Sequence, residues 1–153
     1  MAITSCLTNT FKEELLQGHH SFNASGDTPA GSAFKIALYT SSATLDTTTT
    51  AYTATNEVAS GGGYTTAGEA LTNTGVAKST VTSYTDFSDV SWTSASFTAR
   101  GCLIYNSSTI SGLTTDASVA IIDFGGDKTV SSGTFTIQFP TNDSSDAIIR
   151  ITS

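Results

Sequence analysis

Apolar and polar side chains alternate with a period of two in two stretches of the chain, residues 34–39 and 135–139. Alternation with this period is typical of a β-strand that buries one face and leaves the other in solvent. The later stretch, with Phe135, Ile137 and Phe139 separated by Thr and Gln, is the cleanest signal of this kind. We therefore predict a half-buried strand in each stretch.

Two further runs, 102–105 and 119–122, are apolar at consecutive positions. Such runs indicate central strands that are covered on both faces. Weaker strand signals are found at 70–72, 80–87, 90–92, 96–99 and 147–151. Residues typical of turns follow or separate these segments at 106–108, 125–127, 131–133 and 140–143.

Seven to nine short strands at this spacing predict an all-β fold, and we expect an antiparallel β-sandwich of the jelly-roll-like kind. A closed barrel remains an alternative. A length of 153 residues fits a single domain, 1–153, with a core of ordinary size.

One segment near the start has helical spacing. Thr10 and Glu13 match the capping-box pattern, Phe11, Leu15 and Leu16 fall on one side, and Gly18 supplies an end. A helix of about two turns is unstable alone in water. We expect it to pack on the domain or on a neighbouring subunit, with residues 1–33 forming a helix and arm and residues 34–153 forming the sandwich body.

A long segment, 41–68, has few large apolar side chains and reads as a loop. Loops of this length in compact domains are usually functional or fixed by a partner. Tyr52 and Tyr64 are its candidate contact residues, since tyrosine gives a large contact area at low entropic cost. Packing within the loop itself is the alternative role for both.

Composition narrows the class of protein. Hydrophobic residues make up 38% of the chain and charged residues 12%, and 29 Thr and 22 Ser account for 51 of 153 positions. This mixture is too apolar for a disordered chain, and it has no apolar run long enough for a membrane span. The net charge of −7 argues against nucleic acid and anionic membranes as partners.

Cysteine usage and the first residues suggest a product that is made in the cytoplasm. The start of the chain has neither the basic nor the apolar part of a secretory signal. Cys6 and Cys102 lack the spacing of a metal or redox motif, and we expect Cys102 to be free and buried. A bridge between the two thiols is left open.

The residues that carry chemistry are few, and we predict no catalytic, cofactor or metal site. His19 and His20 are adjacent and have no further ligands at a recognisable spacing. The acids Asp86, Asp89, Asp123 and Asp127 are better explained as turn caps than as catalytic pairs, with calcium as a weaker option. The glycines at 61–63 are followed by no phosphate-binding lysine. The profile favours a binding or structural part over an enzyme.

Several blocks of sequence carry a resemblance. They are KIALYTSSATL (35–45), TAYTATNEV (50–58), GY (63–64), WTSASFTARG (92–101), LIYN (103–106), DFGGDKT (123–129), GTFTIQFP (133–140) and AIIR (147–150). Together they resemble a family of small virion structural proteins of tailed bacteriophages. The similarity extends from about residue 11 to residue 151.

The resemblance implies a virion protein that is made in the host cytoplasm, and we expect a capsid decoration (cement) protein that binds the major capsid protein between subunits. Such a part is expected to be a homo-oligomer, with a trimer favoured. The N-terminal segment and loop 41–68 would then reach across neighbouring subunits and become ordered there. The interface candidates are Phe11, Leu15, Leu16, Tyr52 and Tyr64.

Two alternatives remain open. One is a tail, baseplate or fibre component that contacts the host surface. The other is a carbohydrate-binding module that stacks sugar rings on Tyr52, Tyr64, Tyr84 and Trp92. Arg100 is expected to pair with one of the acids.

Overall fold

The computed structural model describes residues 2–24 and 26–153, and these residues form a mostly β structure. The elements in chain order are β1 (Cys6–Leu7), α1 (Asn9–Leu16), β2 (Phe34–Tyr39), β3 (Glu69–Leu71), β4 (Asn73–Ser79), β5 (Thr82–Phe87), β6 (Val90–Asn106), β7 (Ala117–Ile137) and β8 (Ile149–Thr152). No helix of the described residues is long and apolar enough to cross a membrane.

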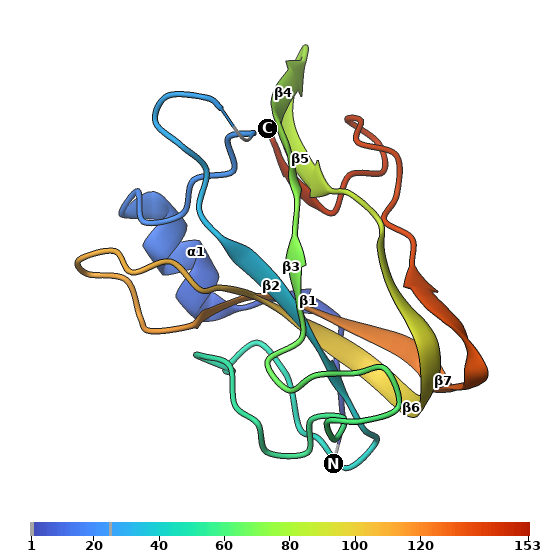
Figure 1. The fold of residues 1–153 in the computed structure, drawn as a ribbon. Coiled ribbons are helices and arrows are strands. Elements are labelled where there is room, and N and C mark those ends of the chain that lie inside the picture. The colour runs from blue at the N-terminus through green and yellow to red at the C-terminus, as the bar shows by residue number, and fades with distance from the viewer. Residues whose placement is uncertain (1, 25) are drawn as a thin grey trace.

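The strands form two antiparallel sheets. The larger has the order β1-β7-β6-β2-β3, and the smaller has the order β4-β5-β8. In Figure 1 the smaller sheet stands above the larger one, and α1 lies to one side. The predicted all-β fold with a short N-terminal helix is confirmed, and the two sheets fit a sandwich. The jelly-roll form stays a prediction.

A long ribbon made by β6 and β7 dominates the larger sheet. The two strands pair from Val90 opposite Ile137 to Asn106 opposite Ala117, with several register shifts between. The turn-like segments 125–127 and 131–133 lie inside β7, where Gly125 has φ 74° and Ser132 has φ 49°. Our expectation that they separate strands was wrong. Bulges absorb the extra residues and bend the strand instead of ending it.

The core lies on both faces of the larger sheet. Phe34, Ile36 and Leu38 of β2 belong to the main cluster, and Ala37 and Tyr39 belong to a second cluster on the opposite face. The predicted strand is therefore confirmed, but the expected half-buried state is wrong. The second face is covered by residues from the N-terminal segment and from loop 41–68.

The helix begins earlier than predicted. Thr8, not Thr10, is its N-cap, and the Thr8 hydroxyl accepts the Phe11 N–H at 3.2 Å while it donates to the Ser118 carbonyl of β7. This second bond ties the cap to the sheet. The end of the helix follows the expectation, because Gly18 has φ 80°. The bonds from Gly18 N–H to Leu15 and from His19 N–H to Glu14 form a Schellman motif.

Candidate functional site: an apolar groove along β7

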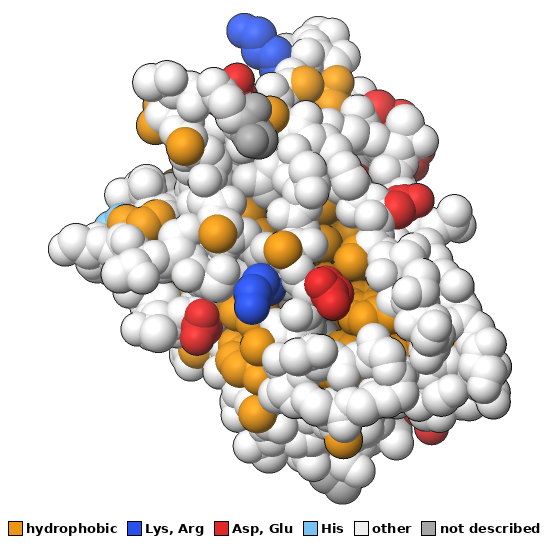
Figure 2. Space-filling view, in the orientation of Figure 1, with side chains coloured by type: hydrophobic (Ala, Val, Ile, Leu, Met, Phe, Trp, Pro, Cys, Tyr) orange, Lys and Arg blue, Asp and Glu red, His pale blue; other side chains and the backbone are white. Residues whose placement is uncertain are grey.

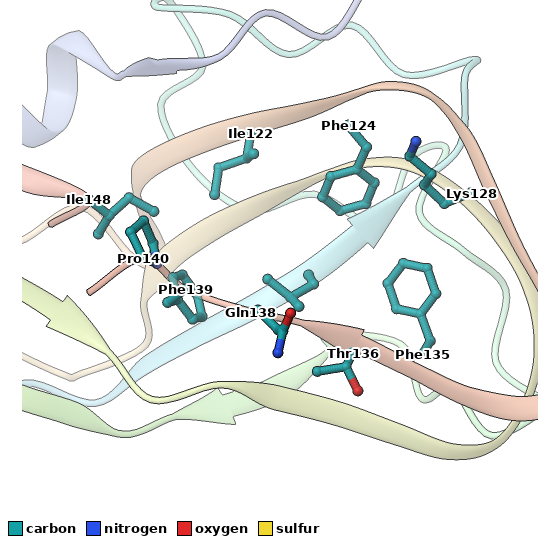
Figure 3. Close-up of a pocket in the computed structure, with 10 residues that line it drawn as sticks. Ile122, Phe124, Lys128, Phe135, Thr136, Gln138, Phe139, Pro140 and Ile148 are labelled. Atoms are coloured by element: carbon teal, nitrogen blue, oxygen red, sulfur yellow. The ribbon is translucent and has the colours of Figure 1, made fainter. Parts of the chain in front are cut away.

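An apolar groove of about 660 Å³ follows the inner side of the bent strand β7. Ile122 and Phe124 come from one arm of the bend, and Phe135 and Ile137 come from the other. Figure 3 shows Phe124 and Phe135 pointing toward each other across the groove, and their ring centres are 6.2 Å apart. The bulge at residues 124–127, which stand opposite the single residue Arg100 of β6, makes this possible because it bends the strand.

The other wall of the groove comes from the segment that connects β7 to β8. It contributes Phe139, Pro140 and Ile148, and two carboxylates hold it in place. Asp89 accepts the Phe139 N–H at 2.9 Å, and Asp86 accepts the Ile148 N–H at 3.2 Å. Both acids therefore bind backbone N–H groups of a distant segment instead of capping their own turn, so the expectation of turn caps at Asp86 and Asp89 was wrong. Burial raises the pKa of Asp86.

One charged side chain, Lys128, lines the groove. The ion pairs of the described residues are His20 with Glu14 and Arg100 with Asp123, so Lys128 has no carboxylate partner within residues 2–24 and 26–153. The remaining polar lining residues are Thr136 and Gln138. A space-filling view shows hydrophobic side chains in a hollow of the face drawn, with single acidic and basic side chains beside them (Figure 2).

The predicted pairing of Arg100 is confirmed. Its guanidinium contacts Asp123 at 2.8 Å and 3.3 Å, and Asp123 also accepts the Gly125 N–H at 3.0 Å. Asp123 is thus a turn cap, as expected, and these bonds hold its pKa below the usual range. Together they brace the bend of β7 beside the groove.

Loop 41–68 is fixed on its own domain by a buried carboxylate. Glu57 accepts the Tyr52 hydroxyl at 2.7 Å, the Tyr64 hydroxyl at 2.6 Å and the Ala67 N–H at 2.8 Å. The Tyr64 oxygen also accepts the Leu38 N–H of β2 at 2.9 Å. The expectation that this loop becomes ordered only on a partner was wrong, because these contacts are made within one chain.

The two tyrosines predicted as contact residues have different surroundings. Tyr64 is 2% exposed and packs in the main core cluster against Trp92 and Phe97 of β6, so it offers no contact surface in this fold. Tyr52 is half-buried and stacks on Tyr105 with ring centres 4.9 Å apart. Burial and the nearby Glu57 carboxylate raise the pKa of Tyr52 to about 12.

The glycines at 61–63 serve this loop by allowing close approach. Gly62 and Gly63 have φ of 52° and 78°, and a Cβ on either would lie within 2.8 Å of a carbonyl oxygen of β6. The Ser96 N–H donates to the Gly62 carbonyl at 2.8 Å. The loop therefore covers the edge of β6 near residues 93–96.

Helix α1 divides its predicted contact residues between the core and the surface. Phe11 is 1% exposed and packs on His20 and Phe22, so it closes the domain's own core. Leu15 is half-buried and Leu16 is 90% exposed. Leu16 lies beside Ile151 of β8 in a shallow hollow between helix and strand. Of the five candidates, Leu16 is the one that is fully available to a partner.

The Schellman turn after α1 places His20 in a buried polar network. Its Nε2 lies 3.3 Å from Glu14, and its Nδ1 lies 3.0 Å from the Asn106 side-chain amide. Glu14 also accepts the Thr114 N–H at 2.8 Å. Both ring nitrogens of His20 are therefore occupied, and burial lowers its pKa. The network joins the helix to the loop between β6 and β7.

The two cysteines lie on opposite faces of the larger sheet. Cys6 packs against the second cluster, and Cys102 lies within the main cluster. Both are free, as expected for Cys102, and burial raises the pKa of Cys102 to about 12. A sheet separates the two thiols, so the bridge left open by the sequence is excluded in this fold. Across residues 2–24 and 26–153, no group of three or more His, Cys, Asp or Glu is placed to hold a metal ion.

The aromatic residues of the carbohydrate alternative do not form an exposed platform. Trp92 and Tyr64 are each 2% exposed, and Tyr52 stacks on Tyr105. Tyr84 is half-buried on β5. Sugar stacking needs an open ring face, so this alternative loses most of the residues that it requires.

Sequence reasoning missed the groove although it found one of its strands. The alternation at 135–139 predicts the apolar face, but Phe124, Lys128 and Ile148 join it only through the bend and the β7–β8 connection. Comparison with known proteins adds no further assignment, because no family model, no curated protein and no solved structure matches this chain.

Proposed function

We propose that the chain is a structural protein of a tailed-bacteriophage virion, and specifically a capsid decoration protein that binds between subunits of the major capsid protein. The proposal starts from the expected resemblance of blocks 35–45, 103–106 and 133–140 to phage virion proteins, and the observation that supports it is the preformed apolar groove along β7. These blocks coincide with β2, the end of β6 and the β7 wall of the groove. The resemblance thus falls on residues that build the scaffold and one wall of its apolar groove.

The geometry supports a role based on contact. The long loop and the N-terminal segment are tied down by buried hydrogen bonds, so the domain presents a preformed surface. A preformed surface loses little conformational entropy on binding. Two apolar areas face outward, the groove along β7 and the hollow with Leu16 and Ile151. Two separate contact areas on one small domain fit a protein that links neighbouring subunits.

The test is the copy number of the protein in purified particles of the phage or prophage that encodes it. We expect quantitative mass spectrometry to give a copy number comparable with that of the major capsid protein. Deletion of the gene should leave infectious particles that lose their genome at lower temperature. A copy number typical of a tail, with heads that form normally and do not infect, would support the tail, baseplate or fibre alternative instead. Absence of the protein from particles would contradict both.

A further inference from the structure

We propose that the groove along β7 binds an extended segment of a different protein, and that this segment pairs with the free edge of β7 as an added strand. The partner segment has large apolar residues at alternate positions and a carboxylate that meets Lys128. The proposal goes beyond a virion role because it states how the partner is recognised. It rests on the proposed function only in taking the partner to be a protein.

The first observation is an unpaired strand edge. The outer edge of β7 is covered only near its start, where β1 pairs with Ala120 and Ile121 and where the Ser5 hydroxyl accepts the Asp123 N–H. From residue 124 to residue 137 the described residues supply no strand on that side of β7. Side chains already accept the N–H groups of Gly125 and Ser132, from Asp123 and Ser96. The rest of this edge has no strand partner among the described residues and is a template for another strand.

The second observation is the apolar surface that accompanies this edge. Residues along the same stretch of β7 line the groove, with Phe124, Phe135 and Ile137 all partly exposed. In strand addition, backbone hydrogen bonds supply affinity and a row of pockets selects alternate side chains. A free edge beside an apolar groove has both components. A groove that is open along one side is less suited to a small molecule, which is normally mostly enclosed.

The third observation is the charge of the lining. Lys128 is the one charged residue of the groove and has no carboxylate within the described residues. A carboxylate on the incoming segment would complement it, whereas a second cation would be repelled.

A second copy of the chain does not meet these requirements. Outside the groove, the exposed large apolar residues of the described chain lie on separate segments, and they are Leu16, Val76, Val81, Ile110 and Ile151. No described strand apart from β7 presents large apolar residues at alternate positions outside the core, and those of β7 already line the groove of their own chain, so a second copy has no further segment to place there. The shared net charge of −7 also opposes close pairing of two copies.

The experiment uses the full chain and synthetic peptides of about nine residues, which is the length of an ordinary strand. In each peptide isoleucine and threonine alternate, and a glutamate stands at either the first or the last position, because the direction of pairing is open. Binding is measured by titration calorimetry and by the fluorescence of Trp92, whose ring centre lies 6.0 Å from that of Phe135. We expect one of the two glutamate peptides to bind. It should bind about fivefold more tightly than the same peptide with lysine in place of the glutamate.

Two sets of variants make the test specific. Lys128→Glu should reverse the preference between glutamate and lysine peptides, while the matched change Lys78→Glu on β4 should leave it intact. Both lysines are exposed, so both variants should fold, which circular dichroism checks. Peptides N-methylated on one set of alternate residues should lose binding, and peptides methylated on the other set should retain it, because a strand pairs through every second N–H.

Three results would overturn the proposal. One is a lack of binding by both glutamate peptides. Another is equal binding by both N-methylated sets, which would mean contact without strand pairing. The last is a dimer of the protein in sedimentation equilibrium that the peptide dissociates, because a second copy would then occupy the edge. None of these results depends on a virion, so the copy number of the protein in particles remains a separate test.

Discussion

Three buried carboxylates each fasten a different loop to the body of the protein. Glu14 accepts the Thr114 N–H, Glu57 accepts the Ala67 N–H, and Asp86 accepts the Ile148 N–H. A buried charge is costly unless it is hydrogen-bonded, and each of these has at least two partners within the chain. The stiffness of this loop-rich protein therefore depends on a few acidic residues that composition alone would assign to the surface.

Glu57 provides the clearest test of this idea. Glu57→Ala leaves the Tyr64 hydroxyl and the Ala67 N–H without their acceptor, so we expect a loss of about 2–4 kcal/mol in the free energy of unfolding. Glu57→Gln should lower the free energy of unfolding by only about 1 kcal/mol. The amide oxygen can still accept from the Tyr64 hydroxyl and the Ala67 N–H, and the Tyr52 hydroxyl can turn to accept from the new amide. Urea unfolding measures this free energy for both variants.

The matched control is Glu69→Ala on β3, where the side chain is exposed and its carboxylate accepts no hydrogen bond from the described residues. Its effect should stay within about 0.5 kcal/mol. Equal losses for Glu57→Ala and Glu69→Ala would show that the tyrosine network contributes nothing to stability.

His20 predicts how stability depends on pH. Burial lowers its pKa in the folded protein, while Glu14 acts in the opposite direction and His19 adds to the lowering. The unfolded chain then binds a proton near pH 6.5 and the folded chain does not, so unfolding takes up a proton. Stability should fall as the pH drops through 6.5, by up to about 1.4 kcal/mol per pH unit.

Denaturant unfolding between about pH 7.5 and pH 5.5 measures this slope, and most carboxylates titrate below that window. In the variant His20→Gln the slope should disappear, and in His19→Gln it should persist. A slope that survives in His20→Gln would assign the effect to another group.

At the scale of elements, the sequence predicted the strands that are marked by alternating or continuous apolar residues. It failed for structure that depends on pairing between distant segments. The apolar runs at 102–105 and 119–122 lie in the paired halves of β6 and β7, as predicted. Strand β4 was missed because its residues are small or polar and its pairing with β5 forms an exposed hairpin. The turn signals in 125–133 were misread because a long paired ribbon can accommodate them as bulges.

Helix α1 separates core packing from surface contact in two residues five positions apart. Phe11→Ala should cost about 3–5 kcal/mol, because it removes a fully buried ring. Leu16→Ala should change the stability of the isolated chain by less than about 0.5 kcal/mol, because the side chain already lies in solvent. If the hollow with Leu16 and Ile151 is the interface of a homo-oligomer, Leu16→Glu should lower the molecular mass measured by light scattering while the subunit stays folded. An unchanged mass would remove Leu16 from the interface candidates.

At the scale of the molecule, the groove exists because two separate parts of strand β7 line it. Residues 122–124 and 135–137 are far apart along a straight strand, and the braced bend brings them to one face. The apolar alternation at 135–137 is visible in the sequence. No local pattern predicts that residues 122–124 lie opposite those residues in the fold. This is why candidate contact residues chosen by type, such as Tyr64, were found in the core, while Phe124 and Ile148 were overlooked.

The last prediction concerns the two sheets, whose residues share one core. Phe87 of β5 packs on Phe34 of β2 with ring centres 5.4 Å apart, and Ile149 of β8 belongs to the same cluster. Neither sheet can keep its buried face covered without the other, so we expect a single cooperative unfolding transition.

The one tryptophan, Trp92 on β6, reports the larger sheet. A variant with Trp92→Phe and Tyr84→Trp moves the reporter to β5. Within each protein, fluorescence and circular dichroism should give the same urea midpoint. A β5 reporter that changes before the circular dichroism signal would show that the smaller sheet opens alone, and that the wall of the groove held by Asp86 is a separate, less stable part.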